Sequence, residues 1–329
     1  MSQERIRTAV IGVGEHGRNH ARHYAALPGS ELVGVYDVRP DRCRAVAEEL
    51  GVRAFESLGE LWEAVKAVSV VIPTTGHAAL ASEAFERGVD VLLEKPITRT
   101  VEEADDLVRQ AEASGCILQV GHVERFNAGV IAAREITQRP LFFEIHRLGV
   151  FSPRSLDVDV VYDLMIHDLD LVLWLVGAPV REVRAVGLPV LSDKVDIANA
   201  RVEFENGAVA NLTASRVSTE KVRKFRYFQL SEYISIDFTR QDVVVVGVDR
   251  AESPPRMDFR KLATQPVQPL RAEIEAFVEC VRTRRPPLAG GLEGRQALAL
   301  AASVMSCIEA HAAKVNFHLA QPPGQSGES

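Results

Sequence analysis

Apolar and polar residues in the first third of the chain follow two alternating patterns. Short apolar runs predict buried strands, and the amphipathic segments between them predict helices. The strands are expected at residues 6–11, 31–36, 69–72, 89–94 and 117–120, and the helices at 18–27, 40–50, 101–113 and a segment ending near residue 88. Strict alternation of strand and helix is typical of a parallel sheet with crossover helices. Residues 1–121 therefore predict an α/β domain with a doubly wound parallel sheet, the Rossmann type.

The pattern changes after residue 121. Longer segments now alternate apolar and polar residues, which indicates strands with one buried face. They are expected at residues 141–149, 196–215, 221–230, 233–238 and 243–248, with a hairpin turn at Glu205-Asn206-Gly207. The apolar segments 160–176 and 297–311 predict helices. Residues 122–329 thus predict an α+β domain with an open, mostly antiparallel sheet and an unstructured tail at 320–329.

Composition narrows the possible functions. A chain of 329 residues is too long for one ordinary core, which supports two domains. The net charge of −7 argues against nucleic acid or an anionic membrane as partner. We find no targeting segment and no apolar stretch long enough to span a membrane, so a cytoplasmic protein is expected. The four cysteines are scattered, and we expect neither disulfides nor a histidine cluster at metal-ligand spacing.

A glycine-rich loop follows the first predicted strand. Gly12, Gly14 and Gly17 match the pattern G-x-G-x-x-G, with Glu15 and His16 between them. In a strand–loop–helix unit, such glycines allow a tight turn, close approach of a pyrophosphate and close helix packing. The start of the helix then faces the phosphates.

An acidic residue, Asp37, ends the second predicted strand, 20 residues beyond Gly17. A carboxylate there accepts hydrogen bonds from the ribose hydroxyls of NAD and repels the additional phosphate of NADP. Arg39 follows two residues later. A basic residue there can tolerate the additional phosphate of NADP, so NADP is an alternative cofactor. The alternative is a structural turn with an exposed aspartate, but position, spacing and charge together favour an NAD site.

Residues after two later strands are also expected to face the cofactor, because ligands bind at the carboxyl ends of parallel strands. They are Pro73, Thr74, His77, Glu94 and Lys95. For His77, a place in a surface loop is an equal alternative. The Lys95 ammonium can stabilise negative charge on a reacting hydroxyl. Glu94 and Pro96 would hold Lys95 in place. The sequence does not decide whether the peptide bond before Pro96 is cis.

Polar residues interrupt the apolar helix predicted at 160–176. Asp163, His167 and Asp170 are spaced four and three residues apart, so they share one helix face. His167 can accept a hydroxyl proton because the pKa of imidazole lies near neutrality. Asp163 can orient that imidazole or bind a substrate hydroxyl. We predict Lys95, Asp163 and His167 as catalytic residues, while for Asp170 a structural role is equally supported.

The segment that joins the two predicted domains holds candidate substrate ligands. His122, Arg125 and Asn127 lie where an interdomain crevice would hold a substrate, and ordinary linker polarity explains them equally well. An anionic substrate group needs local cations, and a guanidinium suits phosphate. Arg154 is the first candidate and Arg147 another, whereas the basic run at 221–226 is expected to be a solvated strand face.

Five segments together resemble a known family. They are GVGEHGRNH, PTTGHA, EKP, GHVERFN and DLMIHDLD. They are similar to the glucose–fructose oxidoreductase/inositol dehydrogenase/rhizopine-catabolism (Gfo/Idh/MocA) family, over residues 6 to about 311. The resemblance implies an NAD-binding Rossmann domain, a C-terminal sheet that often forms a homodimer or homotetramer, and catalysis by Lys95, Asp163 and His167. Gly76 departs from the proline or asparagine that the family usually has before the histidine.

Three segments, GHVERFN, RLGVFSPRS and DVDVVYDLMIHDLDL, resemble the family members that act on nucleotide-activated amino sugars. This resemblance implies NAD-dependent oxidation of the 3-hydroxyl of a UDP-sugar, UDP-N-acetylglucosamine. It places the reaction in lipid A amino-sugar synthesis, where an aminotransferase uses the keto product. The alternatives are a cyclitol or free-sugar dehydrogenase, an NAD-dependent glycosidase, and a non-catalytic NAD-binding regulator. Retention of Lys95, Asp163 and His167 argues against a regulator, which needs none of them.

Overall fold

The computed structural model describes residues 5–151, 158–249 and 254–315, so Arg154 lies outside the described residues. The chain divides into two compact units, residues 1–127 with 267–298 and residues 128–266 with 299–329. Within the described ranges, no helix has both the length and the apolar character needed to cross a membrane.

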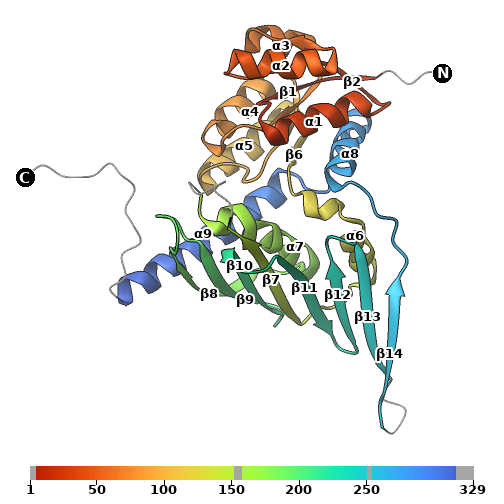
Figure 1. Cartoon of the computed structure of the whole chain (residues 1–329), viewed down its shortest axis with the longest axis vertical. Coiled ribbons are helices and arrows are strands. Elements are labelled where there is room, and N and C mark those ends of the chain that lie inside the picture. Colours follow the sequence, from red (N-terminus) through yellow and green to blue (C-terminus); the bar gives the residue numbers. More distant parts are fainter. Residues whose placement is uncertain (1–4, 152–157, 250–253, 316–329) are drawn as a thin grey trace, which may run out of the picture. The chain divides into compact units, whose positions relative to one another are not determined.

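The first unit is built on a parallel sheet (Figure 1). Its six strands lie in the order β3-β2-β1-β4-β5-β6, the order of dinucleotide-binding Rossmann sheets. The strands are β1 Ile6–Ile11, β2 Ser30–Tyr36, β3 Arg53–Ala54, β4 Ala67–Val70, β5 Asp90–Leu93 and β6 Leu118–Val120. The helices are α1 Glu15–Ala26, α2 Pro40–Leu50, α3 Leu58–Ala64, α4 His77–Glu86, α5 Val101–Ser114 and α8 Pro269–Thr283. The predicted parallel sheet is confirmed.

Helix α8 was missing from the sequence-based prediction and joins this unit from far along the chain. Its Ile274 and Phe277 are fully buried in one core with Val10 and Tyr24, and α8 packs against α1. A helical pattern does not reveal which sheet will bury the apolar face of the helix, because that depends on contacts distant in sequence. The short elements β3 and α3 were also missed.

The second unit contains an eight-stranded sheet in the order β14-β13-β12-β11-β7-β10-β9-β8. Neighbouring strands are antiparallel except for β7 and β10, which confirms the mostly antiparallel prediction. The strands are β7 Phe142–Val150, β8 Val180–Leu188, β9 Ile197–Phe204, β10 Val209–Ser218, β11 Val222–Gln229, β12 Glu232–Asp237, β13 Asp242–Asp249 and β14 Arg256–Leu262. Helix α6 (Ala128–Ile136) packs against β12 and β13, and α9 (Gly291–Lys314) has residues in both units.

The helix predicted at 160–176 has two parts. It begins with a π-helical segment, Val161–Met165, and continues as α7, Ile166–Val176. Gly177 ends it with φ 61°, a left-handed conformation that favours glycine. The π-helical segment packs against β10. Such segments often occur at functional sites, and this one contains Asp163.

Candidate active site

Five of the predicted cofactor residues line one pocket at the carboxyl ends of β1, β2 and β4. They are Gly12, Gly14, Asp37, Arg39 and Pro73. This is the point at which the order of the sheet reverses, where ligands bind in doubly wound folds. Further lining residues that the sequence did not single out are Arg42, Leu58, Thr75 and Leu80.

The three glycines of the loop have different roles. Gly12 has φ +85°, and a side chain there would overlap the carbonyl of Val71. A side chain at Gly17 would overlap the carbonyl of Gly12. At Gly14 the nearest atom to an added Cβ is 3.7 Å away, in the flexible side chain of Arg42. Gly12 and Gly17 are therefore required by the turn itself, while Gly14 has open space beside it.

Asp37 is buried and fixed beside this loop. Its Oδ2 accepts the N–H of Val13 at 2.9 Å, and its Oδ1 accepts the N–H of Arg39, also at 2.9 Å. The Arg42 guanidinium lies 3.5 Å from Oδ2. The side chain of Arg39 is exposed and pairs with Asp41 at 2.8 Å. A rigid carboxylate in this position suits the ribose hydroxyls of NAD.

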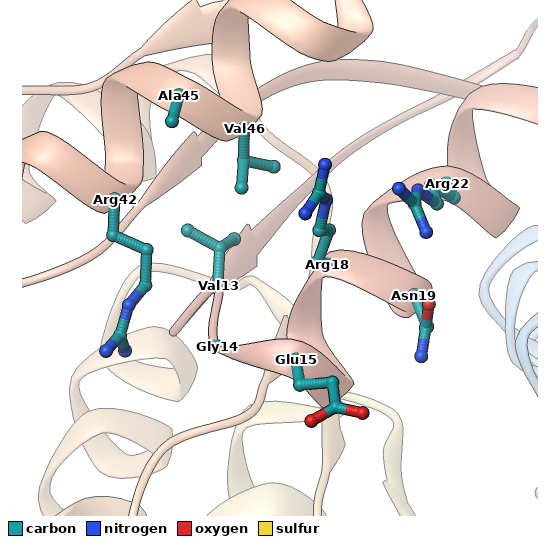
Figure 2. Close-up of a pocket in the computed structure, with 9 residues that line it drawn as sticks. All are labelled: Val13, Gly14, Glu15, Arg18, Asn19, Arg22, Arg42, Ala45 and Val46. Atoms are coloured by element: carbon teal, nitrogen blue, oxygen red, sulfur yellow. The ribbon is translucent and has the colours of Figure 1, made fainter.

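Three arginines flank a second pocket beside Gly14 (Figure 2). Arg42 extends from α2, and Arg18 and Arg22 extend from α1. Hydrogen bonds from Arg18 and Arg22 hold the pKa of Glu49 below its usual value, and Glu49 in turn offsets their charge. Two of the three arginines beside the glycine loop are thus paired with Glu49, and Arg42 lies 3.5 Å from Asp37.

Lys95 lies in a constrained segment after β5. Its backbone N–H donates to Glu94 Oε2 at 3.2 Å, and the Lys95–Pro96 peptide is cis. His77 is buried, with Nδ1 at 2.9 Å from the Pro96 carbonyl and Nε2 at 3.0 Å from the Ile72 carbonyl. His77 is therefore no surface loop residue, and it ties the ends of β4 and β5 together. Burial lowers its pKa.

Glu94 also contacts two histidines of α1. Nε2 of His16 lies 3.0 Å from Glu94 Oε1, and Nε2 of His20 lies 3.2 Å from the same oxygen. Burial alone would raise the pKa of Glu94, but the hydrogen bond from His16 and the neighbouring imidazole of His20 outweigh it and lower that pKa well below its usual value. The hydrogen bond to Glu94 raises the pKa of His16, whereas burial lowers that of His20.

The expectation of no histidine cluster at metal-ligand spacing is wrong. His16, His20 and Glu94 bring three possible ligand atoms within 4.8 Å of one another. The overlooked signal was local, because residues at i and i+4 share one helix face. The third member, Glu94, is 78 positions away from His16, and only the fold brings it there.

The joining segment is buried within the first unit. His122, Arg125 and Asn127 are 1%, 3% and 1% exposed. Arg125 donates to the carbonyl of Leu288 at 2.8 Å. These side chains are buried, whereas the polar side chains of an ordinary linker are exposed.

In the second unit, Asp163 and His167 are partly exposed, whereas Asp170 is buried. Neighbouring Asp168 forms a two-pronged, buried ion pair with Arg147, with N–O distances of 2.8 and 2.7 Å. The Arg147 guanidinium also stacks on Phe238, 5.1 Å from its ring centre. Arg147, a candidate phosphate ligand in the sequence, is thus engaged in holding α7 to β7.

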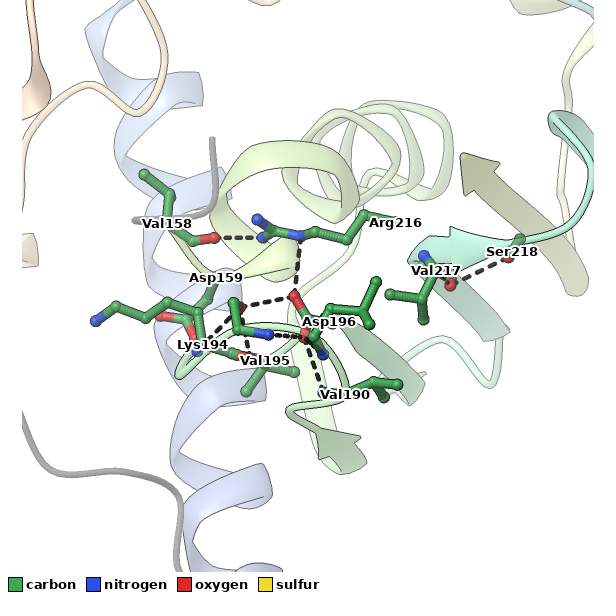
Figure 3. Close-up of polar contacts among 12 residues, drawn as sticks. Val158, Asp159, Val190, Lys194, Val195, Asp196, Arg216, Val217 and Ser218 are labelled. Atoms are coloured by element: carbon green, nitrogen blue, oxygen red, sulfur yellow. Dashed lines mark hydrogen bonds and ion pairs between the residues drawn. The ribbon is translucent and has the colours of Figure 1, made fainter. Parts of the chain in front are cut away.

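A polar network fixes the start of the helix that carries Asp163 and His167 (Figure 3). Asp159 Oδ1 accepts the N–H of Val195 at 2.8 Å, and Arg216 donates to the carbonyl of Val158. Arg216 also lies 3.6 Å from Asp196. We did not predict Asp159, Asp196 or Arg216, because their partners are distant in sequence.

The chain is similar to known proteins over both units. Residues 6–122 match the family described as "Oxidoreductase family, NAD-binding Rossmann fold", and residues 147–232 match the GFO/IDH/MocA C-terminal domain. A UDP-N-acetylglucosamine 3-dehydrogenase from Acidithiobacillus ferrooxidans is 42% identical over 93% of this chain and 98% of its own length. Its solved structure has a TM-score of 0.88 and covers 94% of this chain and 99% of that chain.

Inositol dehydrogenases are more distant relatives. A scyllo-inositol 2-dehydrogenase (NAD(+)) from Bacillus subtilis is 28% identical over 87% of this chain and 89% of its own length. A myo-inositol 2-dehydrogenase from Thermotoga maritima is 27% identical over 92% of this chain and 96% of its own length. Together with the NAD-binding Rossmann unit, these matches show that the chain belongs to the Gfo/Idh/MocA family of oxidoreductases.

Proposed function

We propose that the chain is an NAD-dependent dehydrogenase that oxidises the 3-hydroxyl of UDP-N-acetylglucosamine to the 3-keto sugar. The observation that carries this proposal is the 42% identity, over nearly the full length of both chains, to a dehydrogenase of that name. The inositol dehydrogenases are only 27% and 28% identical. A cyclitol is therefore the second candidate substrate.

The proposed reaction uses Lys95, Asp163 and His167. His167 accepts the proton of the 3-hydroxyl as C3 loses a hydride, and the C–O bond becomes a carbonyl. Bound NAD would supply the acceptor for the hydride that leaves C3. The Lys95 ammonium stabilises the charge that develops on the oxygen, and Asp163 orients His167 or binds a neighbouring hydroxyl. Glu94 and His77 support Lys95 through the contacts of its backbone segment.

The remaining predicted residues are assigned to the cofactor and the substrate. We assign the loop residues Gly12, Gly14, Glu15, His16 and Gly17 to the pyrophosphate side. Asp37 takes the ribose hydroxyls, with Arg39 beside it. Pro73, Thr74 and His77 belong to the strand end near the cofactor. The substrate candidates remain His122, Arg125, Asn127 and Arg154.

The test is a turnover assay with a substrate panel. Purified protein with NAD and UDP-N-acetylglucosamine should form NADH and a product two hydrogen atoms lighter, and an added aminotransferase should increase the yield by removing the keto sugar. NADH from myo-inositol but not from any UDP-amino sugar would overturn the substrate assignment. NAD binding without turnover on any substrate would indicate a regulator, and aglycone release without net NADH a glycosidase.

The catalytic assignment is tested by substitution. Lys95→Ala and His167→Ala should each lower kcat by about 10²–10⁴-fold, the usual contribution of a positioned acid–base group. Lys314→Ala, at the exposed end of α9, is the matched control and should leave kcat unchanged. Turnover of either variant within a few-fold of the unmodified protein would exclude the proposed mechanism.

We further propose that the chain forms a homodimer or homotetramer through the face of its eight-stranded sheet that bears Phe142. Support comes from a row of aromatic residues there. Phe142 and Phe228 have ring centres 5.8 Å apart, and Phe228 and Tyr233 4.9 Å apart. Light scattering after size exclusion should give a multiple of the single-chain mass of 36.1 kDa. The Phe228→Lys variant should have a lower measured mass, closer to that of one chain. A single-chain mass for the unmodified protein would contradict this proposal.

A further inference from the structure

Two histidines and one carboxylate converge in the first unit, and the proposed reaction gives these three side chains no joint role. His16 and His20 lie one helical turn apart on α1 and share a face. Their Nε2 atoms lie 3.0 and 3.2 Å from one oxygen of Glu94, which follows β5. The three donor atoms thus lie within 4.8 Å of one another.

The buried histidine of this cluster has an unsatisfied nitrogen. Nε2 of His20 is fully buried and has no hydrogen-bond partner among the described residues, although Glu94 Oε1 is 3.2 Å away. The other ring nitrogen, Nδ1, lies 3.1 Å from Ser69 Oγ. When Nδ1 donates to Ser69, the lone pair of Nε2 and the carboxylate oxygen are two acceptors side by side. A cation between them removes that repulsion.

The donor set selects the class of cation. Imidazole and carboxylate together suit Zn²⁺ and Co²⁺, whereas Mg²⁺ and Ca²⁺ prefer oxygen ligands alone. Ligands on a tetrahedral zinc ion lie about 3.3 Å apart, as follows from its bond lengths. The two separations from Glu94 Oε1, 3.0 and 3.2 Å, are close to that value, and the two histidine nitrogens lie within 4.8 Å of each other. Three protein ligands would leave the fourth position to water.

The surroundings of the cluster resemble the outer shell of a metal site. Ser69 orients His20 and is itself 2.8 Å from the hydroxyl of Tyr24. The second oxygen of Glu94 accepts the backbone N–H of Lys95. Hydrogen bonds of this kind orient metal ligands and increase affinity. The side chain of His16 is 54% exposed, which provides an entry path.

We propose that the cofactor-free protein binds one Zn²⁺-class ion through His16, His20 and Glu94. The proposal needs only the geometry of the first unit and does not depend on which sugar the protein oxidises.

Co²⁺ is the probe for the experiment, because its visible absorption reports coordination. Tag-free, chelator-treated full-length protein should bind one Co²⁺ per chain with the intense absorption of a four-coordinate ion, and Zn²⁺ should abolish that signal. His16→Ala should lower the Co²⁺ affinity at least about tenfold. His23→Ala is the matched control, because it removes a histidine of the same helix from outside the cluster.

Two further variants keep the proposal testable if one of them folds poorly. Glu94→Gln keeps the shape of the side chain and removes the anionic ligand, so the Co²⁺ signal should be lost. Ser69→Ala should weaken binding about tenfold through loss of the outer contact. Circular dichroism verifies the fold of each variant. No Co²⁺ spectrum, or equal affinity of His16→Ala and His23→Ala, would overturn the proposal, whatever the outcome of the sugar assay.

Discussion

Glu94 in the first unit and Asp196 in the second are both shielded carboxylates, but their partners differ in kind. Asp196 Oδ2 accepts three backbone N–H groups, from Val190, Leu191 and Ser192, at 2.7–2.9 Å. The partners of Glu94 Oε1 are two imidazoles. Backbone N–H groups are fixed dipoles that do not titrate. Asp196 is therefore a permanent anchor, whereas the imidazole partners of Glu94 can gain and lose protons.

The pKa shifts follow from these partners. Burial would raise the pKa of Asp196, but hydrogen bonds from Leu191, Val190 and Ser192 outweigh it and lower the pKa. Asp196 therefore contributes stability that is present above the ordinary carboxyl pKa and is lost as pH falls through the lowered value. The ion pair of Glu94 and His16 needs both charges, and the pKa of His16 is raised. The stability that this pair contributes is therefore lost at low pH and also as pH rises through the raised pKa of His16.

The largest expected effect comes from removing the anchor. Asp196→Ala leaves three part-buried N–H groups without the acceptor that they share and removes the carboxylate that lies 3.6 Å from Arg216, so the free energy of unfolding should fall by about 2–4 kcal/mol. Urea unfolding at pH 7 measures it. The exposed neighbour Asp193→Asn is the control and should change stability by less than about 0.5 kcal/mol. Equal effects of the two changes would show that Asp196 is no anchor.

Glu273 is a third buried carboxyl group, and neither of its oxygens has a hydrogen-bond partner in the described part of the chain. Burial, and then the charge of Glu94, raise its pKa well above the usual value. The folded state thus holds a proton that the unfolded state releases, so stability falls as pH rises above the ordinary carboxyl pKa.

The Glu273→Met substitution should remove this loss of stability at high pH. We expect the variant to be about 1–2 kcal/mol more stable than the unmodified protein at pH 8, with a smaller difference at pH 5. Thermal unfolding at both pH values measures it, with the exposed Glu275→Gln as control. A difference that is the same at pH 5 and pH 8 would contradict the assignment of a neutral Glu273.

The smallest expected effect is the pH response of His16. Because His16 is exposed, its ion pair is screened and should contribute a few tenths of a kcal/mol. This contribution should be present below the ordinary histidine pKa of about 6.5 and disappear as pH rises through the raised value. His16→Ala should therefore have a flatter stability profile between about pH 6 and 9. An unchanged slope would mean that the environment of Glu94 is as fixed as that of Asp196.

Much of the fold and part of the candidate site could be predicted from local patterns. The residues that the cofactor loop requires are close in sequence, as the overlap of a Gly17 side chain with the Gly12 carbonyl illustrates. Asp37 likewise follows the next strand directly. The helix near Asp163 was expected, but its π-helical start was not, because hydrophobic periodicity does not distinguish one extra residue in a turn.

The alternation of strands and helices, the glycine loop and the acidic residue after β2 follow from local sequence, because each depends on neighbouring residues. Which distant side chains meet follows only from the fold. It placed α8 in the core of the first unit, gave both nitrogens of His77 a backbone carbonyl, and brought Glu94 to His16 and His20. The physical reason is that burial and electrostatics depend on distance in space, and a periodic pattern specifies only which face of an element is apolar.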